Sequence, residues 1–230
     1  AGKDAALVVE DVVAAEVCLT WQRENGELRR IYGMIASVVE QFDVEHESVH
    51  SYRLRMGPRT HRLDLVRMQE CYLDMSDVDV IRAKLENVEL GDSDYSFVGL
   101  YDTYAAREFI VQYDETDMAF VSRLAENLGI AFHYDHADGR DRIVFTDSNA
   151  GFAAGEEQLR LKLRTDEIGV SQLRATSQTI PEMYVVMDYN YRTPNIDLTS
   201  QSAAERGYAG GVCESGGHFK TQDQGKRLAG

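Results

Sequence analysis

The first third of the chain alternates apolar and polar residues with a period of two, the pattern of strands that bury one face. The segment EVCLTWQ places Val17, Leu19 and Trp21 on one side of such a strand, and NGE at residues 25–27 supplies the hairpin turn after it. The segments LRRIYGMIASVVEQF and ESVHSYRLRMGP continue the alternation. We therefore predict an antiparallel meander at the start of the chain.

Helical spacing of apolar residues begins after Ser76, in SDVDVIRAKLENV. Ser76 followed by Asp79 resembles a capping box, with Asp in place of the usual Glu or Gln. We expect this helix to end before Gly91.

The clearest unit lies between residues 107 and 146. REFIVQY predicts a strand, residues 115–128 a helix, and IAFHYDH and RIVFT two strands that turn through Asp138-Gly139. EMYVVMDYNY predicts a late strand, whereas the glycine-dense GYAGGVCESGGHF predicts a loop. The pattern as a whole indicates an α+β fold that is rich in antiparallel strands.

The stretch VQYDETDMAFVSRLAENLGI holds four carboxylates, on Asp114, Glu115, Asp117 and Glu126. Paired acids can act in hydrolysis, so a wall-degrading hydrolase domain is one hypothesis. It requires at least two of these carboxylates to face one cleft.

Ordinary helix chemistry offers another interpretation of the same acids. Asp114 stands where an N-cap is expected, and Glu115 and Asp117 then fall in the first turn, near the positive end of the helix dipole. Arg123 and Glu126 have the spacing of a surface pair, and Gly129 supplies the left-handed residue that ends a helix. On this interpretation we predict no catalytic residue and no enzyme activity.

The composition and net charge of the chain limit the kinds of molecule that it is expected to bind. The formal net charge is −15, and no run of Lys and Arg forms a basic stripe, which disfavours nucleic acid and anionic membranes as partners. His133 and His136 are three apart on a predicted strand and point to opposite faces, so we predict no metal site and no cofactor.

Cys18, Cys71 and Cys213 are widely spaced, and we expect them to be reduced and buried.

The stretch around the acids closely resembles the signature of VgrG proteins, the spikes of bacterial type VI secretion, which are related to the hub proteins of contractile phage tails. The residues that fill the family pattern are Val111, Gln112, Tyr113, Asp114, Glu115, Asp117, Phe120, Arg123, Leu124, Glu126, Gly129 and Ile130. LRRIYGMIASV is similar to a second family strand, through Arg30, Gly33 and Ile35. The likeness covers residues 8–229.

The resemblance implies a phage tail hub-like fold with two barrel-like antiparallel β-domains and a few connecting helices. Residues 1–60 and 150–230 would form the first domain, and residues 61–149 the second, which contains the strand–helix–strand–strand unit. It also implies that further N-terminal strands and a C-terminal needle lie outside this chain.

The implied function is structural: the base of a cell-puncturing spike that caps a hexameric tube in a contractile secretion machine. The implied partners are two further copies of the chain in a homotrimer, a tube protein of the Hcp type, and effector or baseplate proteins. The protein would be assembled in the bacterial cytoplasm without a signal peptide and then injected. The hub of a phage or phage-like contractile tail is the alternative.

Overall fold

The computed structural model describes residues 8–23, 26–42, 50–153, 170 and 172–229. The chain divides into two compact units, residues 1–153 and 154–230. The elements of the first unit are α1 (Val9–Val12), β1 (Glu16–Gln22), β2 (Leu28–Phe42), β3 (His50–Gly57), the 3-10 helix η1 (Arg59–Leu65), β4 (Arg67–Met75), α2 (Asp77–Asn87), β5 (Tyr95–Gly99), β6 (Arg107–Thr116), α3 (Asp117–Asn127), β7 (Ala131–Asp135), β8 (Arg142–Thr146) and η2 (Asn149–Gly151). Those of the second are β9 (Met183–Met187), β10 (Ser200–Ala203), β11 (Gly211–Ser215) and α4 (Gln222–Ala229).

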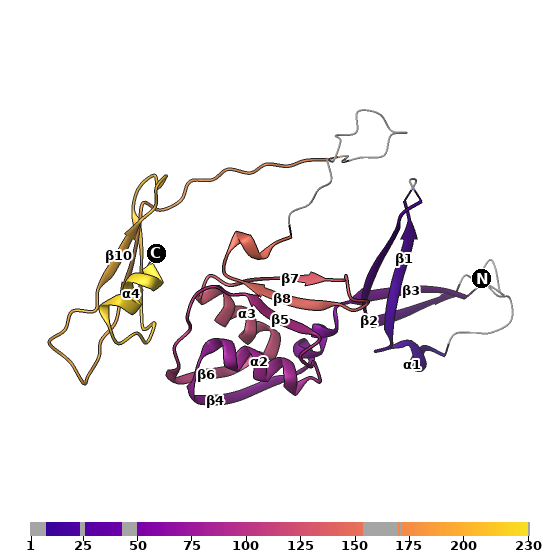
Figure 1. Cartoon of the computed structure of the whole chain (residues 1–230), viewed down its shortest axis with the longest axis horizontal. Coiled ribbons are helices and arrows are strands. Elements are labelled where there is room, and N and C mark those ends of the chain that lie inside the picture. The colour runs from indigo at the N-terminus through magenta and orange to yellow at the C-terminus, as the bar shows by residue number, and fades with distance from the viewer. Residues whose placement is uncertain (1–7, 24–25, 43–49, 154–169, 171, 230) are drawn as a thin grey trace. The chain divides into compact units, whose positions relative to one another are not determined.

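The predicted meander is confirmed as the sheet β1–β2–β3, in which both pairs are antiparallel (Figure 1). Leu19 lies opposite Ile31, so the two side chains share one face. A bulge between Ile35 and Ser37 then shifts β2 by one residue and returns Val38 to that same face. At Gly33 a side chain would collide with the backbone of Gly57, which explains the glycine in this strand.

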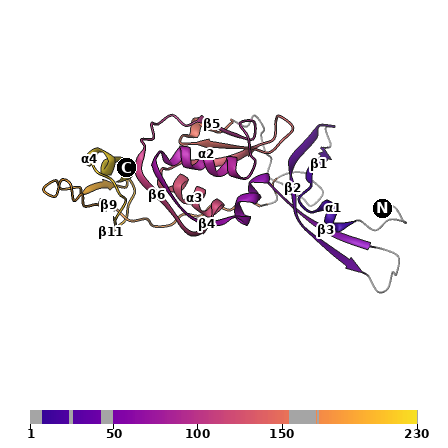
Figure 2. The same ribbon diagram turned by 90° about the horizontal axis from the view of Figure 1, so that it is seen from below.

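The main hydrophobic core lies around α2 and α3. These helices pack between the two-stranded ribbon β4–β6 on one side and the mixed sheet β5–β8–β7 on the other (Figures 1 and 2). The most deeply buried apolar side chains come from η1, α2, α3 and β8: Leu63, Val80, Ile81, Leu85, Phe120, Val121, Ile143 and Phe145. The predicted order of strand, helix, strand, turn and strand is confirmed here, with Gly139 at φ 76° in the turn.

The second unit is a three-stranded sheet with β9 in the centre. β10 pairs antiparallel to β9, and β11 pairs parallel to it. The late strand is therefore confirmed, but the loop predicted for GYAGGVCESGGHF is wrong, because residues 211–215 form β11. A small core of Val186, Leu198, Phe219 and Ala229 lies between this sheet and α4.

The described residues form mostly antiparallel sheets with a few helices, so the α+β class is confirmed. The sheets are open at their edges in these residues. The burial predicted for the cysteines is wrong, because Cys18, Cys71 and Cys213 are all exposed on strands. Among the described helices, none is both long and apolar enough to span a membrane.

Candidate functional site: the acidic signature and a buried lysine

The signature segment, residues 111–130, runs through the end of β6, the whole of α3 and the residue before β7. Its helix packs as the apolar spacing predicts, with four side chains fully buried: Phe120, Val121, Leu124 and Ala125. Arg123 and Glu126 are exposed on the opposite face. Gly129 has φ 68°, which confirms it as the left-handed residue that ends the helix.

The predicted role of Asp114 as the N-cap is wrong. The cap is Thr116, whose side-chain oxygen accepts a hydrogen bond from the backbone N–H of Ala119 at 3.2 Å. Asp114 instead lies in β6 with φ 49°, where the register with β4 shifts, and aspartate is one of the few residues that tolerates this left-handed conformation. Arg67 fixes it by donating to its carboxylate at 3.0 Å and to its carbonyl oxygen at 2.9 Å.

Glu115 is also in the strand rather than in the first helical turn. Arg123 donates to both of its carboxylate oxygens, at 2.6 and 3.2 Å, and to the carbonyl oxygen of Val111 at 3.0 Å. The predicted surface pair of Arg123 with Glu126 is therefore replaced by a link between α3 and β6. The guanidinium also lies 5.2 Å from the ring centre of Phe120, which adds a cation–π contact.

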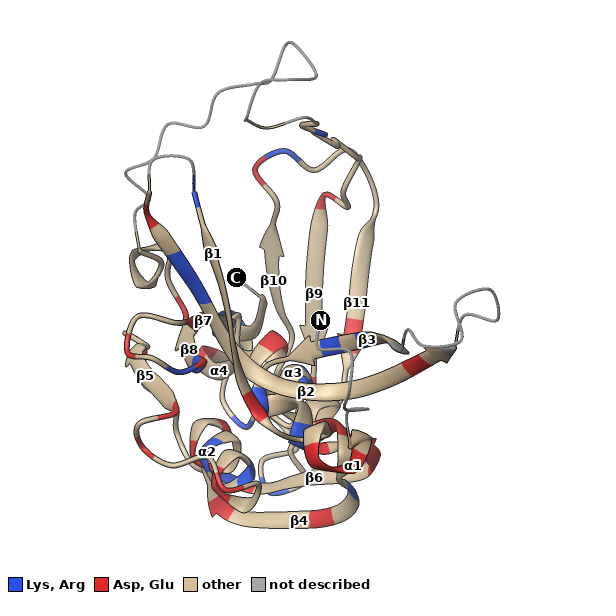
Figure 3. Cartoon of the chain, turned by 90° about the vertical axis from the view of Figure 1, so that its right-hand side faces the viewer, with Lys and Arg blue, Asp and Glu red and all other residues tan. Residues whose placement is uncertain are grey.

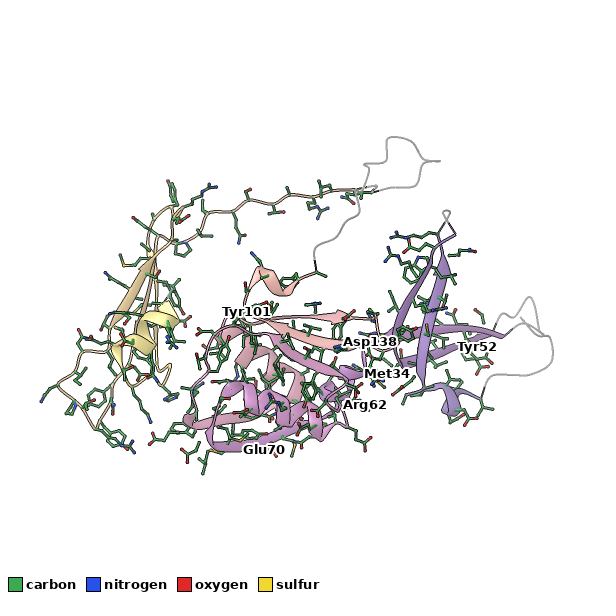
Figure 4. All side chains as sticks on the ribbon, viewed as in Figure 1. Met34, Tyr52, Arg62, Glu70, Tyr101 and Asp138 are labelled. Atoms are coloured by element: carbon green, nitrogen blue, oxygen red, sulfur yellow. The ribbon has the colours of Figure 1, made fainter. Side chains whose placement is uncertain are left out.

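Asp117 does fall in the first helical turn, but its main partner is a lysine from another helix. Lys84 on α2 and Asp117 are 0% and 1% exposed, and their Nζ and Oδ1 atoms are 2.9 Å apart. The ammonium also donates to Glu70 of β4 at 2.7 Å, and Gln112 of β6 donates to Asp117 at 2.8 Å. Glu70 is labelled on its strand in Figure 4. The lysine thus ties both helices to the ribbon.

The electrostatics of this cluster favour the charged pair. Burial alone would lower the pKa of Lys84, but its hydrogen bonds with Glu70, Tyr72 and Asp117 outweigh burial and raise that pKa. The lysine and then the Tyr72 hydroxyl lower the pKa of Glu70. Burial and the bond to Glu70 raise the pKa of Tyr72 to about 12. The ammonium also lies 5.6 Å from the Tyr72 ring and 5.9 Å from the Phe120 ring.

A second cluster joins the first sheet to the helical core. Arg59, in η1, places its Nε 2.5 Å from Asp141 Oδ1 and its Nη2 2.8 Å from Asp94 Oδ1. Glu16 of β1 lies 3.8 Å from Arg59 and 3.6 Å from Arg62.

The backbone at this junction adds a further link. The N–H of Tyr32 donates to the Nδ1 atom of His136 at 3.2 Å, so this histidine serves the contact between β2 and the loop after β7. His133 packs instead against Phe152, with ring centres 5.1 Å apart. The two histidines therefore do not converge, and no cluster of ligands fit for a metal occurs among the described residues.

The carboxylates of the signature segment lie at separate places and do not share one site. Three of them have a different cation each: Asp114 has Arg67, Glu115 has Arg123 and Asp117 has Lys84. Cavities lie beside η1 at Thr60 and His61, beside β1 at Cys18 and in the second unit at Tyr184, and none of the signature carboxylates lines them. The geometry required by the hydrolase hypothesis, two of these carboxylates in one cleft, is not found in the described part of the chain.

Sequence reasoning missed Lys84 and Glu70. A signal for the lysine was available, because Lys84 follows Val80 and Ile81 at helical spacing and so falls on the apolar stripe of α2. A cation in that position requires a buried counter-charge. Glu70 gave no comparable signal.

The assignments of Thr116 and Asp114 predict distinct stability changes. Thr116→Ala should lower the free energy of unfolding by about 1 kcal/mol, because the Ala119 N–H loses its acceptor. Asp114→Ala should cost about 1 kcal/mol or more, whereas Asp114→Gly should cost less, because glycine adopts φ 49° without strain. Urea denaturation followed by circular dichroism measures all three. Equal losses for the two Asp114 variants would contradict the bulge.

Comparison with known protein families extends the resemblance of the signature segment to the whole chain. The phage tail baseplate hub (GPD) family matches residues 1–230. The chain belongs to this family. Among curated proteins, this hub-family chain is 25% identical over 206 residues to the type VI secretion system spike protein VgrG5 of Pseudomonas aeruginosa, covering 86% of the chain and 26% of VgrG5. It is 31% identical over 143 residues to VgrG3 of Vibrio cholerae, covering 62% of the chain and 14% of VgrG3.

Solved structures agree with the hub assignment. The E. coli c3393 protein, described as a type VI secretion component similar to the T4 phage tail proteins gp27 and gp5, matches with a TM-score of 0.59 and 28% identity over 71% of the chain and 44% of that protein. A 43 kDa tail protein of prophage MuSo2 from Shewanella oneidensis shares the fold, with a TM-score of 0.50 and 11% identity over 95% of the chain and 70% of that protein. The resemblance to VgrG proteins is confirmed. The chain spans about a quarter or less of the two curated relatives.

Proposed function

We propose that this chain forms the base of a cell-puncturing spike in type VI secretion, as a ring of three copies that caps a hexameric tube of Hcp-type subunits. The family match over the whole chain and the spike proteins among its relatives support this function. The role is mechanical. The ring would provide a firm platform that is driven outward together with the tube. The protein would be assembled in the cytoplasm and then injected.

The structural observation that carries the proposal is the apolar face of the first sheet. Leu19, Ile31 and Leu54 are exposed on it, with Leu19 55% and Leu54 49% accessible, and Trp21 extends it along β1. Sheet faces of this kind are normally covered. A ring of copies would cover them repeatedly with one type of interface.

We infer that residues 1–60 and 150–230 contribute to one β-domain, with residues 61–149 inserted between them. Both sheets outside the insertion leave apolar residues exposed, among them Met183 and Met187 on β9. Effector or baseplate proteins would be further partners of the assembled ring.

Sedimentation equilibrium of the full chain, alone and mixed with a purified hexameric tube protein, tests the proposal. We expect three times the monomer mass and co-sedimentation with the tube protein. Leu19→Asp should weaken self-association by at least about tenfold, because it places a charge in an apolar interface.

The matched control is Thr20→Asp, which adds the same charge to the adjacent exposed residue on the opposite face of β1. It should leave the trimer intact. A monomer at every concentration, or equal effects of the two variants, would overturn the proposed ring.

A further inference from the structure

The outer face of the β4–β6 ribbon is a second exposed apolar surface, built from Cys71, Leu73, Phe109, Val111 and Tyr113. The register places Cys71 opposite Val111 and Leu73 opposite Phe109, so these side chains form one continuous stripe. Leu73 is 65% exposed and Tyr113 72% exposed. The alternate residues of both strands face α2 and α3 instead.

This stripe is more than a scatter of surface hydrophobics. Single exposed apolar residues are ordinary, but a contiguous row across two strands marks an interaction surface. Within the described residues, β4 pairs with no strand other than β6, so its outer edge is not paired with another strand there.

The charged side chains around the ribbon indicate whether an acidic or a basic protein fits this surface. Among the described residues, the two arginines of the ribbon strands each pair with a carboxylate of the chain, Arg67 with Asp114 and Arg107 with Asp77. Asp74, at the end of β4, forms no ion pair with any described residue. Figure 3 shows acidic positions on β4 and the neighbouring loops. In the described part of the two strands both arginines are thus already paired, which disfavours an acidic partner.

The same charges disfavour a second copy of this chain. Two copies placed face to face on this ribbon would each bring Asp74 to the shared border, so like charges would meet there. A partner with a basic border would instead meet complementary charge there and bury the stripe.

We propose that the outer face of the β4–β6 ribbon is a docking surface for another protein, which covers it with apolar side chains bordered by lysine and arginine. This surface is separate from the face of the first sheet and does not depend on the ring. The proposal gives a protein-binding role to Val111 and Tyr113, two residues of the family signature.

Cys71 offers a built-in probe of the surface, because it is exposed within the stripe. In a Cys18→Ser, Cys213→Ser background, the rate of its alkylation by iodoacetamide is measured with and without a 12-residue peptide of alternating leucine and lysine. We expect the peptide to slow the reaction at least about fivefold, and added salt to weaken the protection. A peptide of alternating leucine and glutamate should give none.

Leu73→Thr with Val111→Thr should abolish the protection, because threonine keeps the strand preference but removes the apolar surface. Val98→Thr is the matched control, since Val98 is 86% exposed on β5, away from the ribbon, and it should leave protection unchanged. The proposal fails if the glutamate peptide protects equally, if Cys71 is protected merely by raising the protein concentration, or if the Val98 variant removes protection as well. Absence of any protection would also overturn it.

Discussion

Replacing Lys84 with methionine should lower the free energy of unfolding by about 3–5 kcal/mol. The variant leaves the carboxylate of Asp117 buried at 1% exposure without its cation. Methionine fills a similar volume, so the loss reports the missing charge and not a cavity. Urea denaturation followed by circular dichroism gives the difference.

Two further variants separate the ion pair from other effects on α2. Arg82→Ala removes a cation from the same helix, but Arg82 is 43% exposed and its pair with Asp79 is on the surface, so the loss should stay below about 1 kcal/mol. Lys84→Met combined with Asp117→Asn should recover part of the loss, because the unpaired charge is gone. A Lys84→Met loss no greater than that of Arg82→Ala would contradict the assigned role.

The buried pair also explains part of the acidity of the signature. Asp117 pairs with Lys84 and accepts a hydrogen bond from Gln112, and Glu115 fastens α3 to β6 through Arg123. The acids organise the packing of two helices on a ribbon. That organisation supports the rigidity expected of a hub.

Local patterns were sufficient to predict the first meander, α2 and the unit from β6 to β8, but not β4 or β5. The period-two alternation of EVCLTWQ and the apolar stripe of α3 depend only on neighbouring residues, and both were predicted correctly. The roles of the acids depend on partners far away in the sequence. Asp114 could not be placed in a bulge without knowing that Arg67 lies beside it on β4, nor Asp117 in the core without Lys84.

Burial was harder to predict than secondary structure for a related reason. The alternation in β1 correctly indicates one apolar face, but the strand's own sequence does not determine what covers that face. Leu19 is therefore on the predicted side and still exposed. The parallel pairing of β11 with β9 was missed because glycines dominate the local signal of that segment.

Replacing Arg59 with methionine should lower the free energy of unfolding at neutral pH by about 3 kcal/mol, the second large loss we expect. Arg59 is the cation of two poorly exposed carboxylates, on Asp141 and Asp94, and it links η1 to the loops that carry them. Arg140→Met is the control, because Arg140 also contacts Asp94, at 3.3 Å, but is largely exposed. It should cost less than about 1 kcal/mol.

The dependence of this loss on pH identifies its cause. Burial alone would raise the pKa of Asp94, but hydrogen bonds from Arg59 and the Gly91 amide outweigh burial and lower that pKa below its usual range. A carboxyl whose folded pKa is lowered adds stability above its unfolded pKa of about 4 and loses it as the pH falls. The difference between wild type and Arg59→Met should therefore be fully present at pH 7 and shrink below about pH 4. A difference that stays constant from pH 7 to pH 3 would mean that Arg59 acts through the packing of its aliphatic stem. It would refute a stabilising role for the ion pairs of Arg59 with Asp94 and Asp141.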